Sequence, residues 1–145
     1  MCVFGISRDY PFKEPAVGNA EVFYDRNRCL FVFIGEGRSV YWLLQERLPK
    51  THRLGDIPRY TDKEVCKVEA RKLVTRNLDI VIRSSPERIT MKDIWETTVK
   101  YNVTATEEAT FRLWHWGRLV CVGDSVHKTT PNMAAGGNMA IESVA

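Results

Sequence analysis

Very short connections between apolar runs constrain the fold of this chain more than any other feature. Runs rich in β-branched and aromatic residues lie at residues 21–24, 29–34 and 39–46. They are separated by turn-forming residues, Asp-Arg-Asn at residues 25–27 and Gly-Glu-Gly at residues 35–37. Such short connections join antiparallel strands but cannot carry the crossover that parallel strands need. The first half of the chain is therefore predicted to form an antiparallel meander.

One more strand is expected at the beginning of the chain. Residues 2–6 are apolar, and the following polar stretch contains Pro11 and Pro15, which lack the N–H group that a β-ladder uses. The run at residues 29–34 is apolar throughout, which predicts burial on both faces of the sheet. A Ser-Ser-Pro sequence at residues 84–86 predicts a break further along the chain.

Two helices are predicted to cover this sheet. The sequence Thr-Asp-Lys-Glu at residues 61–64 predicts a capping box that begins the first helix at Thr61, with Asn77 or Asp79 near its end, and Thr90 begins the second helix. The residues expected to face the core are Val65, Val68, Ala70, Leu73 and Val74 in the first helix, and Ile94, Trp95, Thr98, Val99 and Tyr101 in the second. The predicted fold class is α+β: an antiparallel sheet with two covering helices, followed by a strand, a loop and a helix.

Composition and charge indicate an ordinary globular protein. The 145 residues suffice for one domain with its own core, and the mean hydropathy is -0.27. The net charge of +3 is too weak and too dispersed to indicate nucleic-acid binding, and no apolar run is long enough for a membrane helix. Four widely spaced cysteines favour free thiols over a zinc site, and Cys29 and Cys121 are expected to act as small hydrophobes. We therefore expect a cytoplasmic protein.

The last part of the chain has the residue order of a ligand site. An apolar run at residues 119–122 is followed by Gly123 and Asp124, by a polar loop to Pro131, and by a glycine pair at residues 136–137 that begins a short helix. A buried strand would deliver Asp124 to its carboxyl end, where a carboxylate accepts hydrogen bonds from hydroxyl groups. The glycines would let backbone N–H groups approach a ligand. Taken singly, however, such a strand end and such a glycine pair are more often a simple turn and a helix cap.

The string GDSVHKTTPNMAAGGNMAIES resembles the second flavin-binding motif, GD-x(n)-P-x(n)-G-x-N, of the FAD-dependent aromatic-hydroxylase-type monooxygenases. It is most similar to their fungal secondary-metabolite branch, which includes the paxilline-pathway epoxidases. By this resemblance, Asp124 would bind the ribityl or ribose hydroxyls of FAD, and Pro131 would border the flavin ring. By the same resemblance, Gly136, Gly137 and Asn138 would begin the helix that points at the flavin pyrimidine. His127 is expected to be solvated or packed, and we do not assign it as a base.

The first part of the chain carries a looser resemblance to the same family. CVFGIS and VYWLLQE resemble strands of the family's substrate domain, so residues 1–113 are expected to be substrate-domain-like and residues 114–145 to be a partial FAD-binding segment. Tyr24 and Tyr41 are candidates to face a substrate, and Tyr24 is the candidate for a catalytic role, although aromatic residues on strands more often pack. Trp114 and Trp116 are expected to pack.

The resemblance implies a flavoprotein oxidoreductase that uses FAD and NAD(P)H to hydroxylate or epoxidise a small-molecule secondary metabolite such as a terpenoid or polyketide. No GxGxxG occurs in the sequence, and in this family that turn holds the pyrophosphate of FAD. We therefore expect a truncated homologue that binds FAD weakly or not at all by itself. Two alternatives stay open. One is a non-catalytic, partner-binding fragment that associates with a full-length enzyme or with itself; the other is a flavin-independent enzyme of the same pathway, for example an isomerase or cyclase.

Overall fold

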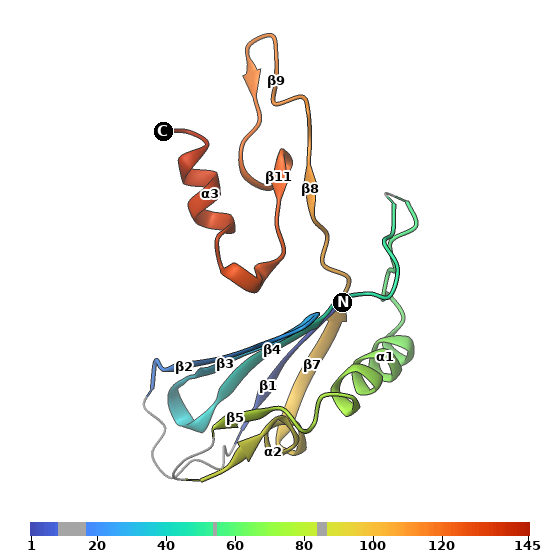
Figure 1. Cartoon of the computed structure of the whole chain (residues 1–145), viewed down its shortest axis with the longest axis vertical. Coiled ribbons are helices and arrows are strands. Elements are labelled where there is room, and N and C mark those ends of the chain that lie inside the picture. Colours follow the sequence, from blue (N-terminus) through green and yellow to red (C-terminus); the bar gives the residue numbers. More distant parts are fainter. Residues whose placement is uncertain (9–16, 54, 84–86) are drawn as a thin grey trace. The chain divides into compact units, whose positions relative to one another are not determined.

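The computed structural model describes residues 1–8, 17–53, 55–83 and 87–145, and the course of the chain is shown in Figure 1. Its fold is α+β, as predicted, and it consists of two compact units, Met1–Ala105 and Thr106–Ala145. The boundary between these units lies before the one that we expected after residue 113. Pro11, Pro15 and the Ser-Ser-Pro sequence at residues 84–86 lie outside the described residues.

The first unit contains a five-stranded antiparallel sheet with the strand order β2-β3-β4-β1-β7. The four strands predicted from apolar runs are confirmed. Their bounds are β1 (Cys2–Ser7), β2 (Ala20–Asp25), β3 (Arg28–Ile34) and β4 (Val40–Glu46). The turn before β3 places Asn27 at φ 65°, and the connection before β4 is a short 3-10 turn, η1 (Glu36–Arg38), with Gly37 at φ 61°. The turn residues thus allow the direct return of the chain that makes the meander.

The fifth strand, β7 (Thr98–Thr104), corrects the predicted length of the second helix. Helix α2 (Met91–Glu96) begins after Thr90 as predicted, because the Asp93 carboxylate accepts hydrogen bonds of 2.8 Å from both the backbone N–H and the hydroxyl of Thr90. The helix ends before Thr98, and the sequence TVKYNVT pairs with β1 instead. Its β-branched residues favour the pleated strand over a helix. Thr98, Val99 and Tyr101 therefore belong to a strand, and their assignment to the helix was wrong.

Helix α1 (Lys63–Thr75) is capped by Asp62 and not by Thr61. The Asp62 carboxylate accepts hydrogen bonds of 2.9 Å from the N–H groups of Glu64 and Val65. Of the predicted core residues, Ala70, Leu73 and Val74 are buried, whereas Val65 and Val68 are 48% and 49% exposed. The fully buried residues of α1 therefore lie in its second half, and the prediction for the two valines was wrong.

The core of the first unit lies on one face of the sheet, which α1 and α2 cover (Figure 1). The residues on this face alternate along the strands, so that Leu30, Val32 and Ile34 of β3 lie opposite Leu44, Trp42 and Val40 of β4. A small hairpin of β5 (Val81–Arg83) and β6 (Ile89–Thr90) precedes α2. On the other face of β3, Phe31 is buried but Phe33 is 47% exposed, so burial on both faces is confirmed only in part.

A buried tryptophan connects the sheet to α2. The Trp42 side chain is 2% exposed, and its ring N–H donates a hydrogen bond of 3.0 Å to the hydroxyl oxygen of Ser7. The Ser7 hydroxyl donates in turn to the carbonyl oxygen of Ile94 in α2 at 2.7 Å. Gly5 lies opposite Trp42 in the ladder, and a Cβ atom at Gly5 would be only 2.3 Å from Cζ2 of the indole. The indole therefore occupies the space of the missing side chain.

The second unit is built from short elements. The two-residue strands are β8 (Ala109–Thr110), β9 (His115–Trp116), β10 (Leu119–Val120) and β11 (His127–Lys128), and the helical elements are η2 (Gly123–Ser125), η3 (Pro131–Met133) and α3 (Gly136–Glu142). Strand β9 pairs with β10, and β8 pairs with β11. None of the helices in the described part of the chain has the length and apolar character that crossing a membrane requires.

The contact between Gly5 and Trp42 gives a test of this packing. Gly5→Ala should lower the free energy of unfolding by about 1–3 kcal/mol, because the added methyl group overlaps the indole and a well-packed core resists insertion. Chemical denaturation followed by circular dichroism measures the change. Gly137→Ala is the matched control, because a Cβ there meets no atom within 4 Å. Equal stability of Gly5→Ala and the wild type would contradict the described indole position.

Candidate functional site

Residues 119–122 do not form the buried strand that we predicted ahead of Asp124. The strand β10 is only two residues long, and its members Leu119 and Val120 are each 71% exposed. It pairs with β9 through a turn at Gly117, where φ is 55°. A unit of this size supplies no second layer to bury a strand. For the same reason Trp116 is 74% exposed and the Cys121 thiol is exposed, which corrects our expectation that both side chains would pack.

The acidic turn lies at the beginning of η2. Gly123 is buried with φ 61°, and a Cβ atom at this position would lie 3.0 Å from the Cβ of Ala140 in α3. The neighbouring Asp124 is exposed, and no hydrogen bond or ion pair joins its carboxylate to another residue in the described part of the chain. Gly123 therefore holds the turn against α3, while both Asp124 oxygens can accept hydrogen bonds from a ligand.

The loop and helix that follow leave backbone groups accessible. Pro131 is exposed at the beginning of η3, and Gly136, Gly137 and Asn138 form the beginning of α3. Neither glycine has a positive φ. A Cβ at Gly136 would meet only the Thr129 hydroxyl oxygen, at 4.0 Å, and a Cβ at Gly137 would meet nothing within 4 Å. Packing within this unit does not require the two glycines, although a glycine loses more backbone conformational entropy on folding than any other residue.

His127 holds this region together from the inside. Its side chain is buried, with ring atom Nε2 2.5 Å from the Ser143 hydroxyl oxygen and its ring centroid 5.3 Å from that of Trp114. The Ser143 hydroxyl donates to the Met139 carbonyl oxygen at 2.7 Å, so the His127 Nε2–H group is the donor to Ser143. This contact fixes β11 on α3. Of the two states that we expected for His127, solvated or packed, the structure shows the packed one.

The first unit presents a second feature, an apolar sheet face that the helices do not cover. We call it the open face. Its residues occupy the strand positions that alternate with the core residues. Their exposed fractions are 42% for Phe4, 48% for Val22, 62% for Tyr24, 47% for Phe33 and 49% for Tyr41.

Aromatic contacts order this open face. The Tyr24 ring lies edge-on to the Phe31 ring, with 5.7 Å between the centroids, and the Phe31 and Phe33 rings lie parallel with a centroid separation of 6.4 Å. Tyr41 is the partner of Phe33 in the β3–β4 ladder. Tyr24 and Tyr41, the two predicted substrate-facing residues, therefore lie on the same face with phenylalanines between their strands.

Comparison with known proteins identifies the family. The model of the FAD binding domain family matches residues 49–145. The chain belongs to this family. The match covers α1, α2 and the whole second unit, including the acidic turn and the glycines of α3. The resemblance that we based on the motif is thus confirmed.

Fungal relatives support the same assignment within the FAD binding domain family. The chain is 38% identical to FAD-dependent monooxygenase verC1 of Penicillium polonicum over 100% of its own length and 17% of that protein. It is 37% identical to FAD-dependent monooxygenase adrH of Penicillium rubens, over 99% of its own length and 30% of that protein. FAD-dependent monooxygenase spyC of Aspergillus fumigatus is 33% identical, with 99% of this chain and 28% of that protein covered. The chain thus spans less than a third of the curated relatives it matches.

A solved structure shows the same fold. The crystal structure of tetracycline destructase Tet(51) superimposes with a TM-score of 0.55 at 10% sequence identity, and the match covers 97% of this chain and 34% of that chain. At this identity the likeness concerns the fold alone. It confirms the α+β fold of this chain.

The residues of the second unit fit the hydroxyl-bearing and ring portions of FAD. The Asp124 carboxylate has acceptor oxygens for hydroxyl groups, and the open space at Gly136 and Gly137 admits a flat ring close to the backbone. The pyrophosphate portion has no match, because no GxGxxG occurs in the sequence. The fit therefore extends to part of the cofactor only.

The hydrogen bond between His127 and Ser143 can be tested separately from cofactor binding. Ser143→Ala should destabilise the second unit by about 1–3 kcal/mol, because it leaves the buried Nε2–H group of His127 without its acceptor. Hydrogen exchange of the β11 and α3 amides measures the effect. Ser125→Ala is the matched control, since it removes an exposed serine hydroxyl that donates to the Val122 carbonyl. Equal exchange in the two variants would contradict the described role of His127.

Proposed function

We propose that this chain supplies the substrate sheet and the flavin-motif segment of an FAD-dependent monooxygenase. The reaction is the hydroxylation or epoxidation of an apolar secondary metabolite such as a terpenoid or polyketide. The observation that carries this proposal is that the exposed Asp124 and the uncovered glycines of α3 lie in one compact unit. The contact of Gly123 with α3 and the hydrogen bond from His127 to Ser143 hold this unit together. Membership of the FAD binding domain family and the fungal relatives support it.

In this proposal each motif residue has its own role. Asp124 accepts hydrogen bonds from the ribityl or ribose hydroxyls of FAD. Pro131 borders the flavin ring. The backbone at Gly136, Gly137 and Asn138 approaches the pyrimidine edge of the ring, which is possible because the glycines have no Cβ atom. These roles follow the family motif position by position.

The open face of the first unit provides the proposed substrate surface. The exposed rings of Phe4, Phe33 and Tyr41 bury an apolar substrate and exclude water from it. Tyr24, which is 62% exposed, orients the substrate and is the candidate for a direct catalytic contact. FAD, reduced by NAD(P)H, supplies the oxygen chemistry when it is bound. The protein contributes binding, orientation and the exclusion of water.

A second candidate function is association with another polypeptide without catalysis. It is favoured by exposed apolar side chains in the second unit, Trp116, Leu119 and Val120, each more than 70% exposed. The partner would be a full-length enzyme of the same family or a second copy of this chain. A flavin-independent reaction, such as isomerisation or cyclisation on the open face, is the other alternative. A cytoplasmic location remains a prediction from the cysteine pattern.

Binding of FAD distinguishes these functions. We expect the 145-residue chain to bind FAD only at concentrations far above micromolar, because the charge-assisted pyrophosphate contacts, each about 1.5–3 kcal/mol, are missing. Asp124→Ala should weaken the remaining affinity by roughly 10- to 100-fold. Titration with FAD up to millimolar concentration, followed by the amide resonances of Gly123 and Gly137, measures both affinities.

Asp79→Ala is the control for this titration, because Asp79 is also an exposed aspartate but lies outside the second unit. It should leave the affinity for FAD unchanged. Two outcomes would contradict the assignment: stoichiometric binding at micromolar FAD, or residual binding that is the same in Asp124→Ala and the wild type. The first would show a pyrophosphate site that we did not recognise, and the second would remove Asp124 from the site.

The substrate surface can be tested with a neutral aromatic probe, 2-naphthol. Titration should shift the amide resonances of β2, β3 and β4. Phe33→Ser should weaken binding about fivefold, because roughly 1 kcal/mol of apolar contact is lost. Phe111→Ser is the matched control: both phenylalanines are 47% exposed, but Phe111 belongs to the second unit. Equal weakening by the two substitutions would count against the open face as the binding surface.

A further inference from the structure

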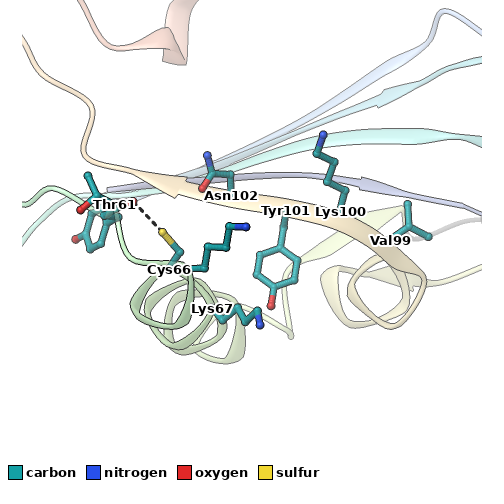
Figure 2. Close-up of a pocket in the computed structure, with 9 residues that line it drawn as sticks. Thr61, Cys66, Lys67, Val99, Lys100, Tyr101 and Asn102 are labelled. Atoms are coloured by element: carbon teal, nitrogen blue, oxygen red, sulfur yellow. Dashed lines mark hydrogen bonds between the residues drawn. The ribbon is translucent and has the colours of Figure 1, made fainter.

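A groove of about 500 Å³ lies in the first unit, between α1 and β7 (Figure 2). The residues that line it are Tyr60, Thr61, Lys63, Cys66, Lys67, Val99, Lys100, Tyr101 and Asn102. Three of them are lysines and none is acidic. The flavin motif and the exposed aromatic residues of the open face are not part of this groove, so the proposed function leaves it unused.

The wall of this groove is the outer edge of the sheet. In the strand order, β7 is the last strand after β1, and no strand in the described part of the chain pairs with its other side. The Val103 N–H group donates to the side-chain oxygen of its neighbour Asn102 at 2.9 Å, and not to β1. Backbone groups of alternate residues in an antiparallel strand point the same way. Tyr101 therefore also directs its N–H and C=O groups to the outer edge, where another strand can pair.

Lysines flank this edge on both sides. In Figure 2, Tyr101 extends from β7 toward Lys67 on the α1 side, whereas Lys100 and Asn102 point to the opposite side of the strand. Lys67 forms an ion pair of 2.6 Å with Glu64, while Lys63 and Lys100 have no ion-pair partner in the described part of the chain. One small anion cannot reach Lys67 and Lys100 together, because the strand lies between them.

An extended chain can reach both lysines. Successive side chains of a β-strand point to opposite faces of the sheet. Two adjacent acidic residues in a strand added to β7 would place one carboxylate near Lys100 and the next near Lys67. Strand addition to an exposed sheet edge is a general mode of peptide recognition, in which the main chain gives affinity and the side chains give specificity.

We propose that the outer edge of β7 binds an extended acidic segment of another polypeptide by strand addition. Its backbone pairs with the N–H and C=O groups of Tyr101, and its adjacent acidic side chains contact Lys100 on one face and Lys67 with Lys63 on the other. A second copy of this chain pairing through its own β7 is disfavoured, because it would bring the two sets of lysines together. The Asn102 side chain limits the added strand by occupying the Val103 N–H group.

The test uses the whole chain and a capped octapeptide with the sequence Thr-Val-Thr-Glu-Glu-Thr-Val-Thr. Binding should shift the Tyr101 amide resonance and slow its hydrogen exchange about tenfold or more at saturation. A peptide with glutamine in place of both glutamates should bind more weakly. A peptide with proline in place of both valines keeps the two charges but loses main-chain donors, so it should leave the Tyr101 exchange rate unchanged.

Protein variants separate the groove from the rest of the basic surface. Lys67→Gln and Lys100→Gln should each weaken peptide binding by about 1.4- to 5-fold, as expected for exposed ion pairs. Lys72→Gln is the matched control, because Lys72 forms the same kind of ion pair with Glu69, at 2.8 Å, on the same helix but does not line the groove. It should leave binding unchanged.

Each of the following results would overturn the proposal. The first is equal binding of the glutamine and glutamate peptides, which would remove the lysines from recognition. The second is weakening by Lys72→Gln as large as that by Lys67→Gln, which would indicate unspecific attraction to α1. The third is an unchanged Tyr101 exchange rate at saturation, or the same shifts with inorganic phosphate, which would show an anion site without strand addition.

Discussion

The two-residue period of the sheet is the constraint on which the rest of the first unit depends. It directs alternate residues of β3 and β4 to opposite faces, so that Trp42 meets Gly5, Ser7 and α2 on one face while Tyr41 stays on the other. On the packed face, the ring N–H of Trp42 and the hydroxyl of Ser7 both have hydrogen-bond partners within the first unit. On the opposite face Phe31 is buried, but Phe33 and Tyr41 beside it are exposed apolar side chains. Such exposed apolar side chains are the physical basis of the proposed substrate surface.

A polar network at the end of the meander shows how the packed side is completed. The buried Asn77 donates to the Leu73 carbonyl oxygen at 2.8 Å and to the Glu46 carboxylate at 3.1 Å, and it accepts a hydrogen bond from Arg28 at 3.0 Å. Burial raises the pKa of Glu46, but the hydrogen bonds from Arg76 and Asn77 outweigh it and hold that pKa below its ordinary value. Asn77 therefore joins the end of α1 to two strands. The sequence predicted only that Asn77 could end the helix, and it did not indicate these contacts.

Local signals in the sequence predicted the elements that local physics determines. Four strands and the start of α2 follow from apolar runs, turn residues and caps, whereas α1 is capped by Asp62 instead of the predicted Thr61. Strand β7 was missed because Thr98 and Tyr101 also have the spacing of a helix face, and only the distant pairing with β1 decides between the two periods. The apolar run at residues 119–122 predicts burial, but a local run does not tell which other part of the chain would cover it. The contact of His127 with Ser143 joins residues 16 apart, with no periodic signal between them.

The glycines distinguish structural from functional positions in a way that the sequence does not. Gly5 and Gly123 are required by the fold, because a side chain would overlap Trp42 at the first and approach Ala140 at the second, where φ is also positive. Gly136 and Gly137 meet no such obstacle, yet each raises the conformational entropy that is lost on folding and so lowers stability. A residue that lowers stability without a packing reason is best explained by what must approach its backbone. The ligand that we propose there is the flavin ring, and the open space at Gly137 is compatible with it.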